Sequence, residues 1–262
     1  MKRTPIASLP EWMPDSIRNF AKGATLFDSS SSPEARVIFI DKGEGFYLKS
    51  APAGTLRDEA VMCDYFYKKG LGVEMLSYLT VQEHDLMLSA RAQGEDCTHE
   101  TYLNDPKRLA ETIALQLRML HECDCSDCPV QDRMRSYFAL AEQNFRNDNY
   151  DKSHFPDSFG YRSALDAYAV MRAGMDTLTD HVLLHGDYCL PNIMLDDWRF
   201  RAFIDLGNGG VGDRHIDLFW GAWTLGFNLG TDAYRERFFD AYGKDKIDKE
   251  RLLVVAATEV FG

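Results

Sequence analysis

Short apolar runs that alternate with turn residues dominate the first ninety residues of the chain. Residues 36–40 (RVIFI) and 45–49 (GFYLK) flank DKGEG, a glycine-containing segment typical of a hairpin turn. Residues 78–81 and 85–89 form a second apolar pair, and residues 56–68 between the pairs have the length and composition of a helix. The pattern predicts a small antiparallel sheet with one helix inserted between its hairpins.

The segment before this sheet contains Pro5, Pro10 and Pro14. Proline lacks the backbone donor that a helix interior needs, so it is disfavoured there. We therefore predict no helix across these residues and expect the segment to wrap onto the sheet.

Helical periodicity replaces strand alternation after residue 105. Residues 106–122 begin at a proline and carry apolar side chains three or four positions apart, at Leu109, Ile113, Leu117 and Leu120. Further helical stretches are expected over residues 132–145, 161–179, 216–227 and 249–261. The pattern predicts an α+β chain with a sheet-rich lobe over residues 1–92 and a mostly helical lobe over residues 93–262, joined near residues 90–94.

The densest polar motif follows a short apolar run, His181–Leu184. This run leads into His185-Gly186-Asp187, so the Asp187 carboxylate is expected on a loop at a strand end, where catalytic groups are common. Asn192 comes five positions after Asp187, and Asp205 comes thirteen positions after Asn192. Whether Asp187, Asn192 and Asp205 come together depends on the structure of the segments that connect them.

Two strand-like runs, residues 193–195 and 200–204, connect Asn192 to Asp205. They flank Asp196-Asp197, an acidic pair typical of a tight turn. A hairpin brings its two ends to neighbouring positions, so we predict that Asn192 and Asp205 lie side by side. Their side-chain oxygens are the hard ligands that Mg²⁺ prefers.

The order of Asp187, Asn192 and Asp205 is that of a kinase centre. Phosphoryl transfer uses one carboxylate that accepts the proton of the attacking hydroxyl, a neutral oxygen ligand on one metal ion, and a second carboxylate that links the metals to the nucleotide. His-Gly-Asp alone, or Asp-Leu-Gly alone, is commonly an ordinary turn. Their combination predicts Asp187 as the catalytic base, with Asn192 and Asp205 as ligands of Mg²⁺.

Lys49 and Glu59 complete the pattern expected of a kinase. Lys49 ends the second predicted strand, and Glu59 lies ten positions later in the predicted helix. In kinases a helical glutamate holds a strand lysine against the α- and β-phosphates of the nucleotide. A lysine at a strand end is otherwise an ordinary solvated charge, so the prediction depends on the downstream motif.

The segment HGDYCLPNIMLDDWRFRAFIDLGNGGVGDRHIDL, which starts at His185, closely resembles the catalytic segment of the aminoglycoside phosphotransferase family, in particular its 3′-type kanamycin and neomycin kinases. The likeness includes Cys189-Leu190-Pro191, Phe203-Ile204-Asp205 with Gly207, and Gly212-Asp213-Arg214 leading to Asp217. Together with weaker matches elsewhere it spans nearly the whole chain. It implies a protein-kinase-like, two-lobed fold.

The resemblance also suggests how the nucleotide phosphates would be covered. The family uses a serine-containing loop there, and the matching positions in this chain are Ser29 and Ser30, within a run of four serines that contains no glycine. Serine hydroxyls and backbone amides can both donate hydrogen bonds to phosphate. A flexible polar linker is the alternative interpretation of this run.

A hinge that binds adenine through backbone groups would include Ser89, Ala90 and Ala92. Small residues suit a flat slot for a base. Arg91 stands where an acidic residue is common in the family, so the choice between ATP and GTP stays open.

The resemblance assigns acceptor recognition to acidic residues of the second lobe. Glu259 and Phe261 match the family's terminal acidic and aromatic positions, which close over the drug. Asp151 and Asp157 lie in the segment that supplies further acids. A cationic acceptor needs carboxylates at hydrogen-bonding distance, because such bonds are strengthened by charge.

The charge of the chain agrees with a cationic partner. The formal net charge is −12, of which residues 1–120 carry −3 and residues 121–262 carry −9. An acidic field repels nucleic acid and attracts polyamine-like molecules. No apolar stretch approaches the roughly 20 residues of a membrane span, and the N-terminus lacks a secretory signal. We expect a cytoplasmic monomer or weak dimer that binds neither nucleic acid nor membrane.

Six cysteines include the cluster Cys123, Cys125 and Cys128, close to His121. A chain of 262 residues without an export signal is expected to keep its thiols reduced. Thiolates and imidazole can bind zinc, but this spacing is not a standard one and no second CxxC faces it. We favour chance or packing, and a zinc-stabilised interaction protein remains the alternative.

These observations predict a kinase that transfers the γ-phosphate of ATP or GTP, with Mg²⁺, to a small cationic alcohol. The resemblance makes that acceptor an aminoglycoside, phosphorylated on its 3′-hydroxyl, which would confer resistance. A kinase of the same fold that acts on choline, methylthioribose or homoserine is the close alternative. A nucleotide-binding protein without turnover is disfavoured, because a pseudoenzyme would usually have lost one of the catalytic residues.

Overall fold

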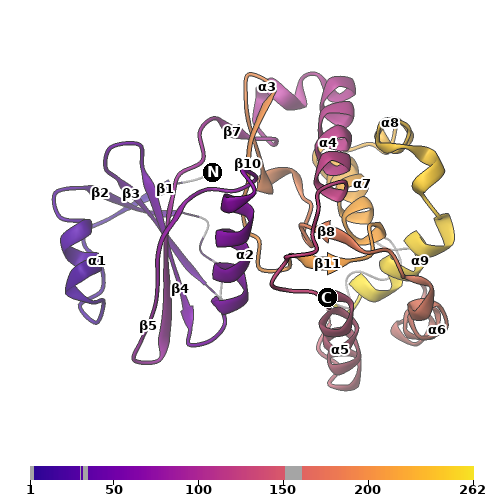
Figure 1. Cartoon of the computed structure of the whole chain (residues 1–262), viewed down its shortest axis with the longest axis horizontal. Coiled ribbons are helices and arrows are strands. Elements are labelled where there is room, and N and C mark those ends of the chain that lie inside the picture. Colours follow the sequence, from indigo (N-terminus) through magenta and orange to yellow (C-terminus); the bar gives the residue numbers. More distant parts are fainter. Residues whose placement is uncertain (1–2, 30, 32–34, 151–160) are drawn as a thin grey trace. The chain divides into compact units, whose positions relative to one another are not determined.

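The computed structural model describes residues 3–29, 31, 35–150 and 161–262. The chain divides into two compact units (Figure 1). Unit 1 comprises Met1–Gly94, Met194–Asp196 and Arg201–Gly207, and unit 2 comprises Glu95–Ile193, Asp197–Phe200 and Asn208–Gly262. Each unit has its own hydrophobic core.

Unit 1 is built on a six-stranded antiparallel sheet. Its strands follow the order β1 (Arg3–Ile6), β2 (Thr25–Ser29), β3 (Arg36–Asp41), β4 (Phe46–Pro52), β6 (His84–Ala90) and β5 (Met75–Val81). Ile38, Leu48 and Leu88 stand opposite one another on neighbouring strands and belong to one buried cluster. The antiparallel sheet predicted from the apolar pairs is confirmed.

Two features of this sheet differ from the sequence-based expectation. The sequence pattern does not predict β1, which places Pro5 opposite Phe27 at the edge of the sheet. A residue without a backbone N–H is tolerated in an edge strand. β4 continues to Pro52, so Lys49 lies in the middle of the strand rather than at its end, opposite Val37 and Met87.

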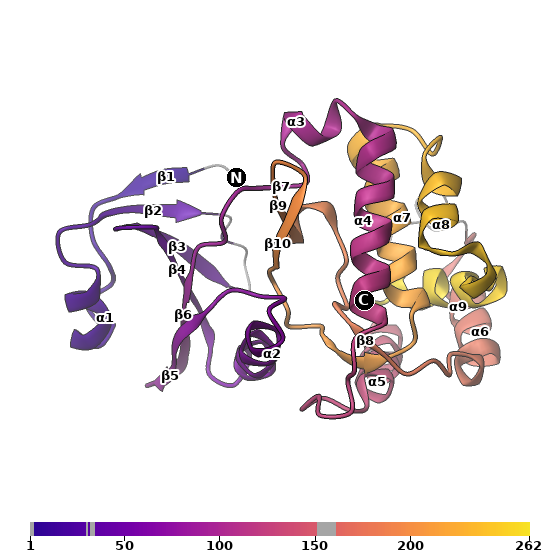
Figure 2. The same cartoon turned by 45° about the horizontal axis from the view of Figure 1, so that its top comes forward.

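In the described part of unit 1 the sheet is accompanied by the helices α1 (Asp15–Phe20) and α2 (Arg57–Lys68). The position of α2 confirms the helix predicted over residues 56–68. It lies near β5 (Figure 2) and buries Met62 and Phe66 completely. The ring of Phe66 meets that of Phe203 edge-on, with 6.3 Å between centroids. These apolar contacts fix the helix that carries Glu59.

Unit 2 is mostly helical, as the sequence predicts. Its helices are α3 (Glu100–Leu103), α4 (Pro106–His121), α5 (Arg133–Arg146), α6 (Ala164–Gly174), α7 (His215–Leu229), α8 (Arg235–Tyr242) and α9 (Lys249–Glu259). Within the residues that the structure describes, 3-10 turns cover Met175–Thr177, Leu190–Asn192 and Lys244–Lys246. In both views α4 lies beside α7 and α8 (Figures 1 and 2).

One predicted helix is shorter than expected. The stretch predicted as a single helix over residues 161–179 contains α6, which ends at Gly174, and a separate 3-10 turn. Glycine has a low helix propensity because it loses more backbone entropy on folding. The short helices α3 and α8 are not predicted from the sequence.

The C-terminal helix α9 packs within the core of unit 2. The ring of Phe261 is completely buried and meets the rings of Phe145 and Tyr150 edge-on, at 5.4 and 5.3 Å between centroids. At the other end of the helix the Asp248 carboxylate accepts the backbone amide of Glu250 at 2.8 Å, which caps the helix. The helix that carries Glu259 is therefore fixed at both ends.

Short strands carry the predicted catalytic segment: β8 (Val182–Leu184), β9 (Ile193–Asp196), β10 (Arg199–Phe203) and β11 (Gly210–Gly212). A further strand, β7 (Glu95–Asp96), pairs with β9. The predicted hairpin of β9 and β10 is confirmed, but its turn lies at Asp197-Trp198, one position later than expected. Both turn residues have positive φ, 48° and 64°, as in a type I′ turn. None of the helices in the described ranges has the length and apolar character that a membrane crossing requires.

Candidate active site

Lys49 lies between two carboxylates in unit 1. Its Nζ contacts the Glu59 carboxylate oxygens at 3.0 and 2.8 Å and Oδ1 of Asp205 at 2.9 Å. The side chains of Lys49 and Glu59 are only 20% and 8% exposed, whereas that of Asp205 is 53% exposed. The pairing of Lys49 with Glu59 that the sequence predicts is present, and Asp205 joins it.

Burial acts to lower the pKa of Lys49, but the neighbouring carboxylates of Asp205 and Glu59 raise it above its ordinary value. Lys49 is therefore a fixed cation at neutral pH. Asp205 has a left-handed backbone, with φ of 59°, which costs energy for a residue with a Cβ atom and is often found at functional sites. Because Lys49 binds only Oδ1 of Asp205, Oδ2 can serve a further ligand.

The loop that carries Asp187 follows β8 in unit 2. Gly186 has φ of 83°, and a Cβ atom there would lie 1.9 Å from the carbonyl oxygen of Asn208, so only glycine fits. The Asp217 carboxylate accepts the backbone amides of His185 and Gly186, each at 2.8 Å. Asp217 thereby fixes the backbone immediately before Asp187.

A buried polar network lies behind Asp217. His121 places Nε2 3.1 Å from Asp217 and Nδ1 2.8 Å from the Tyr242 hydroxyl. Burial lowers the pKa of His121, so the neutral ring donates from Nε2 to the carboxylate and accepts at Nδ1. The Tyr242 hydroxyl accepts in turn from Arg214 at 3.1 Å. This network supports the loop from three helices and is not evident in the sequence.

Asn192 lies beside Asp187. Its Nδ2 donates to Oδ2 of Asp187 at 2.9 Å and to the backbone carbonyl of Asp187 at 3.0 Å. Both amide hydrogens are thus engaged, so Oδ1 of Asn192 is the side-chain atom that can face a cation. The structure brings Asp187 and Asn192 together in unit 2, and Lys49, Glu59 and Asp205 together in unit 1. The expected adjacency of Asn192 and Asp205 stays a prediction.

Glu259 lies at the end of α9 and is 9% exposed. Its Oε1 accepts the Tyr137 hydroxyl at 2.7 Å, and the Trp220 side chain donates a further hydrogen bond. Burial raises the pKa of Glu259 to about 7, although these two hydrogen bonds act to lower it, and the Asp187 carboxylate adds to the rise. Glu259 is therefore within electrostatic range of Asp187.

The other residues predicted to bind the acceptor are Phe261, Asp151 and Asp157. The ring of Phe261 has no exposed surface, and its backbone carbonyl accepts Nδ2 of Asn144 at 2.8 Å. The ring therefore belongs to the core and anchors the end of α9, and the role of Phe261 in binding the acceptor stays a prediction. Asp151 and Asp157 lie outside the described residues.

The predicted serine loop begins later than expected, because the segment up to Ser29 belongs to β2. Ser29 is completely buried, and its hydroxyl has no hydrogen-bond partner within the described ranges. Ser30 lies outside those ranges. Buried hydroxyls are usually hydrogen-bonded, so Ser29 retains an unused donor close to the predicted phosphate loop.

The predicted hinge residues lie at the end of β6 and just after it. Ser89 and Ala90 close the strand, and the amide of Ala90 donates to the carbonyl of Glu74 at 2.8 Å. Ala92 is buried against Met194 in a small apolar cluster of unit 1. This cluster provides an apolar surface beside the hinge backbone.

Cys123, Cys125, Cys128 and His121 are not among the described residues that bring three potential ligand atoms close together. Of the described residues, only Asp180, Asp213 and His215 bring three such atoms within 4.8 Å of one another. Arg251 supplies positive charge at that place, since its Nη1 lies 3.3 Å from both carboxylates. Both nitrogens of His121 are engaged with Asp217 and a tyrosine, so the zinc alternative gains no support.

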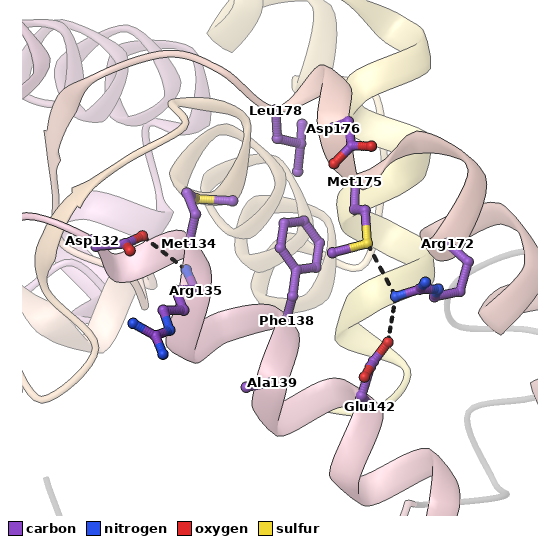
Figure 3. A pocket seen from close by; sticks show the side chains of 10 residues that line it. All are labelled: Asp132, Met134, Arg135, Phe138, Ala139, Glu142, Arg172, Met175, Asp176 and Leu178. Carbon is purple, nitrogen blue, oxygen red and sulfur yellow. Dashed lines mark hydrogen bonds and ion pairs between the residues drawn. The ribbon is translucent and has the colours of Figure 1, made fainter.

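A groove of about 470 Å³ lies along α5 (Figure 3). Arg172 lines it on one side and contacts the Glu142 carboxylate and the sulfur of Met175 (Figure 3). The other residues that line the groove are Asp132, Met134, Arg135, Phe138, Ala139, Asp176 and Leu178. This lining includes none of the predicted site residues, so the groove is separate from the candidate site.

Comparisons with known proteins agree with the geometry. The sequence pattern of the phosphotransferase enzyme family matches residues 26–253. A probable aminoglycoside 3'-phosphotransferase of Lactococcus lactis subsp. lactis (strain IL1403) is 51% identical over 96% of each chain.

Two solved structures are similar in fold. The crystal structure of aminoglycoside-3'-phosphotransferase of type VIII has a TM-score of 0.80, with 19% identity over 94% of this chain and 97% of that one. A Streptomyces rimosus ATCC10970 aminoglycoside phosphotransferase, APH(3'')-Id, in complex with ADP and streptomycin has a TM-score of 0.74, with 23% identity over 86% of this chain and 90% of that one. The predicted protein-kinase-like α+β fold is confirmed.

Proposed function

Because the chain belongs to the phosphotransferase enzyme family, we propose that it transfers the γ-phosphoryl group of ATP to the 3′-hydroxyl of an aminoglycoside and so confers resistance. The observation that carries this proposal is the likeness, at half of all positions and over nearly the whole chain, to the lactococcal relative of that name. The paired side chains of both units supply the chemistry that such a reaction needs.

The phosphoryl donor would use residues of both predicted motifs. Lys49, held by Glu59, neutralises charge on the α- and β-phosphates. Asp205 and Asn192 offer a carboxylate and an amide oxygen, a donor set that suits Mg²⁺. Bound Mg²⁺ would neutralise charge on the β- and γ-phosphates. Backbone groups of the hinge hold the adenine.

Asp187 acts on the acceptor hydroxyl. Its carboxylate takes the proton while the hydroxyl oxygen bonds to the γ-phosphorus and the bond to the departing ADP breaks. Asn192 fixes the orientation of the carboxylate, and Asp217 fixes the backbone that carries it. Positioning therefore supplies much of the catalysis.

Glu259 is our leading candidate for binding an ammonium group of the acceptor. It lies within electrostatic range of Asp187, so a cation bound to it would stand near the reacting hydroxyl. Asp151 and Asp157 are proposed as further acids that meet the remaining ammonium groups.

We place the enzyme in the cytoplasm because it consumes ATP, and we propose a monomer or weak dimer without nucleic acid or membrane partners. Residues 90 and 92 would meet the base whether the donor is ATP or GTP. Initial rates with each nucleotide at equal concentration establish the preference.

The test is phosphoryl transfer by the purified chain with Mg²⁺ and ATP. Kanamycin and neomycin are expected to be phosphorylated, and NMR of the product should show the phosphate on the 3′-oxygen. Choline, methylthioribose and homoserine belong in the same panel as alternative acceptors. Turnover of one of these, with none of the aminoglycosides, would refute the acceptor and leave the kinase assignment standing.

A further inference from the structure

Asp85 is a completely buried acidic residue of β6, in unit 1, and the proposed chemistry does not use it. Its Oδ2 accepts the backbone amides of Gly54 at 2.8 Å and Leu56 at 3.0 Å. Its Oδ1 accepts the hydroxyl of Thr80, in the neighbouring strand β5, at 2.7 Å. Burial of a charge is costly unless the charge is hydrogen-bonded, so these bonds hold the carboxylate in one place.

The Asp85 side chain is ionised at neutral pH. Burial acts to raise its pKa, but the hydrogen bonds from Thr80 and from the amide of Leu56 hold the pKa below its ordinary value. Hydrogen bonds to a charged acceptor are stronger than those between neutral groups. The bonds from Gly54 and Leu56 are therefore stronger than the ordinary contacts of a surface turn.

The two amides belong to the connection between β4 and α2. β4 ends at Pro52 and α2 begins at Arg57, so the connection is residues 53–56. Leu56 precedes the first residue of the helix, and its carbonyl accepts the amide of Ala60 at 2.9 Å. The apolar side chain of Leu56 cannot cap the helix. The Asp85 carboxylate, which comes from a different strand, therefore fixes the point at which α2 begins.

Asp85 lies on the same face of the sheet as Lys49. In the pairing of β4 with β6, Ala51 stands opposite Asp85, and Lys49 stands opposite Met87. Residues directly opposite each other in an antiparallel pair point to one face, and so do residues two apart along a strand. One face of the sheet therefore carries both the lysine that contacts Glu59 and the carboxylate that holds the start of α2.

The position of Glu59 depends on where α2 begins. Glu59 lies in the first turn of the helix, three positions after Leu56, so a displacement of the start moves Glu59 with it. The Glu59 oxygens lie 3.0 and 2.8 Å from Nζ of Lys49. A displacement of about 1 Å would take these atoms beyond hydrogen-bonding distance.

We propose that Asp85 is a positioning residue, which fixes the start of α2 against the sheet so that Glu59 holds Lys49 in place for the nucleotide phosphates. The inference rests on the proposed transfer of phosphate from ATP and adds a residue that controls binding of the nucleotide. Lys49 and Glu59 serve the donor in that proposal. Loss of Asp85 should therefore weaken binding of Mg-ATP and leave binding of the acceptor almost unchanged.

The test compares Asp85→Ala with Asp85→Asn in calorimetric binding of Mg-ATP and in steady-state phosphorylation of kanamycin. The alanine variant is expected to lose about tenfold in affinity for Mg-ATP, the ratio that corresponds to hydrogen bonds to one charged group. KM for kanamycin should stay within about twofold. Asparagine keeps an oxygen that can accept both amides and a nitrogen that can donate to Thr80, so Asp85→Asn should bind Mg-ATP within about threefold of wild type.

Thr55→Val is the matched control within the same connection. It removes an exposed hydroxyl that donates to the carbonyl of Pro52 at 2.6 Å, and it leaves the amides that Asp85 accepts in place. Affinity for Mg-ATP and KM for kanamycin should both stay at the wild-type values.

The Glu59→Gln background separates positioning from a general loss of stability. If Asp85 acts through Glu59, Asp85→Ala should lower the Mg-ATP affinity of Glu59→Gln by no more than about twofold. Thr80→Val gives the same comparison if Asp85→Ala does not fold, because it removes the donor to Oδ1 of Asp85 from an exposed position. Its affinity for Mg-ATP should fall by about threefold in the wild-type background.

The inference is overturned if the folded variant, Asp85→Ala or in its place Thr80→Val, keeps the wild-type affinity for Mg-ATP, or if it lowers that affinity equally in both backgrounds. Failure of the proposed function has a different signature. A wild-type chain that binds Mg-ATP but does not phosphorylate kanamycin would overturn the proposed acceptor and leave the role of Asp85 standing.

Discussion

Asp187 is the residue on which the proposed reaction depends most directly. Replacement by asparagine keeps the shape of the side chain and removes the proton acceptor, so kcat should fall by at least about 100-fold. Binding of Mg-ATP should be almost unchanged, which calorimetry can check. Asp205→Ala is the matched comparison and should lose Mg-ATP affinity instead. Turnover of Asp187→Asn within about tenfold of wild type would argue against its role as the base.

The buried position of Glu259 predicts that binding of the acceptor depends on pH. Burial raises its pKa to about 7, so its carboxylate becomes neutral as the pH falls below that value. A neutral group attracts ammonium less strongly, and KM for kanamycin should rise several-fold between about pH 8 and pH 6. KM for ATP should change much less over the same range.

The Glu259→Gln variant provides the control for this profile. Protonation of the substrate amines affects both enzymes equally, so the difference between their profiles isolates the carboxylate. If the two profiles run parallel, Glu259 does not titrate against the acceptor and its assignment to the site fails.

Some residues of the candidate site can be predicted from the sequence, and others cannot. Asp187 and Asn192 lie five positions apart on one loop, so a local motif indicates both. His121 and Asp217 are 96 positions apart, and their contact depends on the packing of α4 against α7. No local sequence pattern predicts a contact between residues so far apart in the chain. The groups proposed to take part in the reaction can therefore be predicted from the sequence more readily than the buried groups that fix the backbone around them.

At the scale of elements, Lys49 shows how the sheet and a helix together make one functional unit. Lys49→Ala removes the cation that we propose meets the phosphates and leaves Glu59 buried without its partner, so kcat/KM for ATP should fall by at least about tenfold. Glu59→Gln should have a milder effect of the same kind, because the lysine remains but is held less firmly. Wild-type kcat/KM in both variants would make the pair an ordinary structural ion pair.

The cap of α9 provides a test of stability that leaves the chemistry aside. Asp248→Ala removes the acceptor of the first helical amides and should cost about 1 kcal/mol of unfolding free energy. For a chain of this size that corresponds to a Tm lower by roughly 2–4 °C. Asp248→Ser keeps a capping oxygen and should lose less. Equal losses in the two variants would mean that the cap contributes nothing specific.

The elements themselves follow largely from periodicity. Five helices of unit 2 and the hairpins of unit 1 arise where apolar spacing is regular over many residues. β1 is not predicted because Pro5 disfavours a strand unless the strand lies at a sheet edge, and edge position is a property of the whole sheet. Lys49 is misplaced by three residues because Ser50, Ala51 and Pro52 have little strand character of their own.

At the scale of the whole molecule, net charge is the property that follows most directly from the sequence. The net charge is −12, and most of it belongs to residues 121–262. Its physical effect is a field that raises the local concentration of a polycation.

This field predicts that acceptor binding weakens with salt. The screening length falls from about 10 Å at 0.1 M to about 3 Å at 1 M ionic strength, so KM for kanamycin should rise by roughly tenfold between 0.05 and 0.5 M NaCl while kcat changes little. Glu259→Gln should reduce the slope, because it removes a carboxylate that we propose contacts the acceptor. Glu236→Gln, which removes an exposed charge paired with Lys244, should leave the slope almost intact. A KM for kanamycin that does not depend on salt would show that shape rather than charge selects the acceptor, and would favour a neutral alcohol as the substrate.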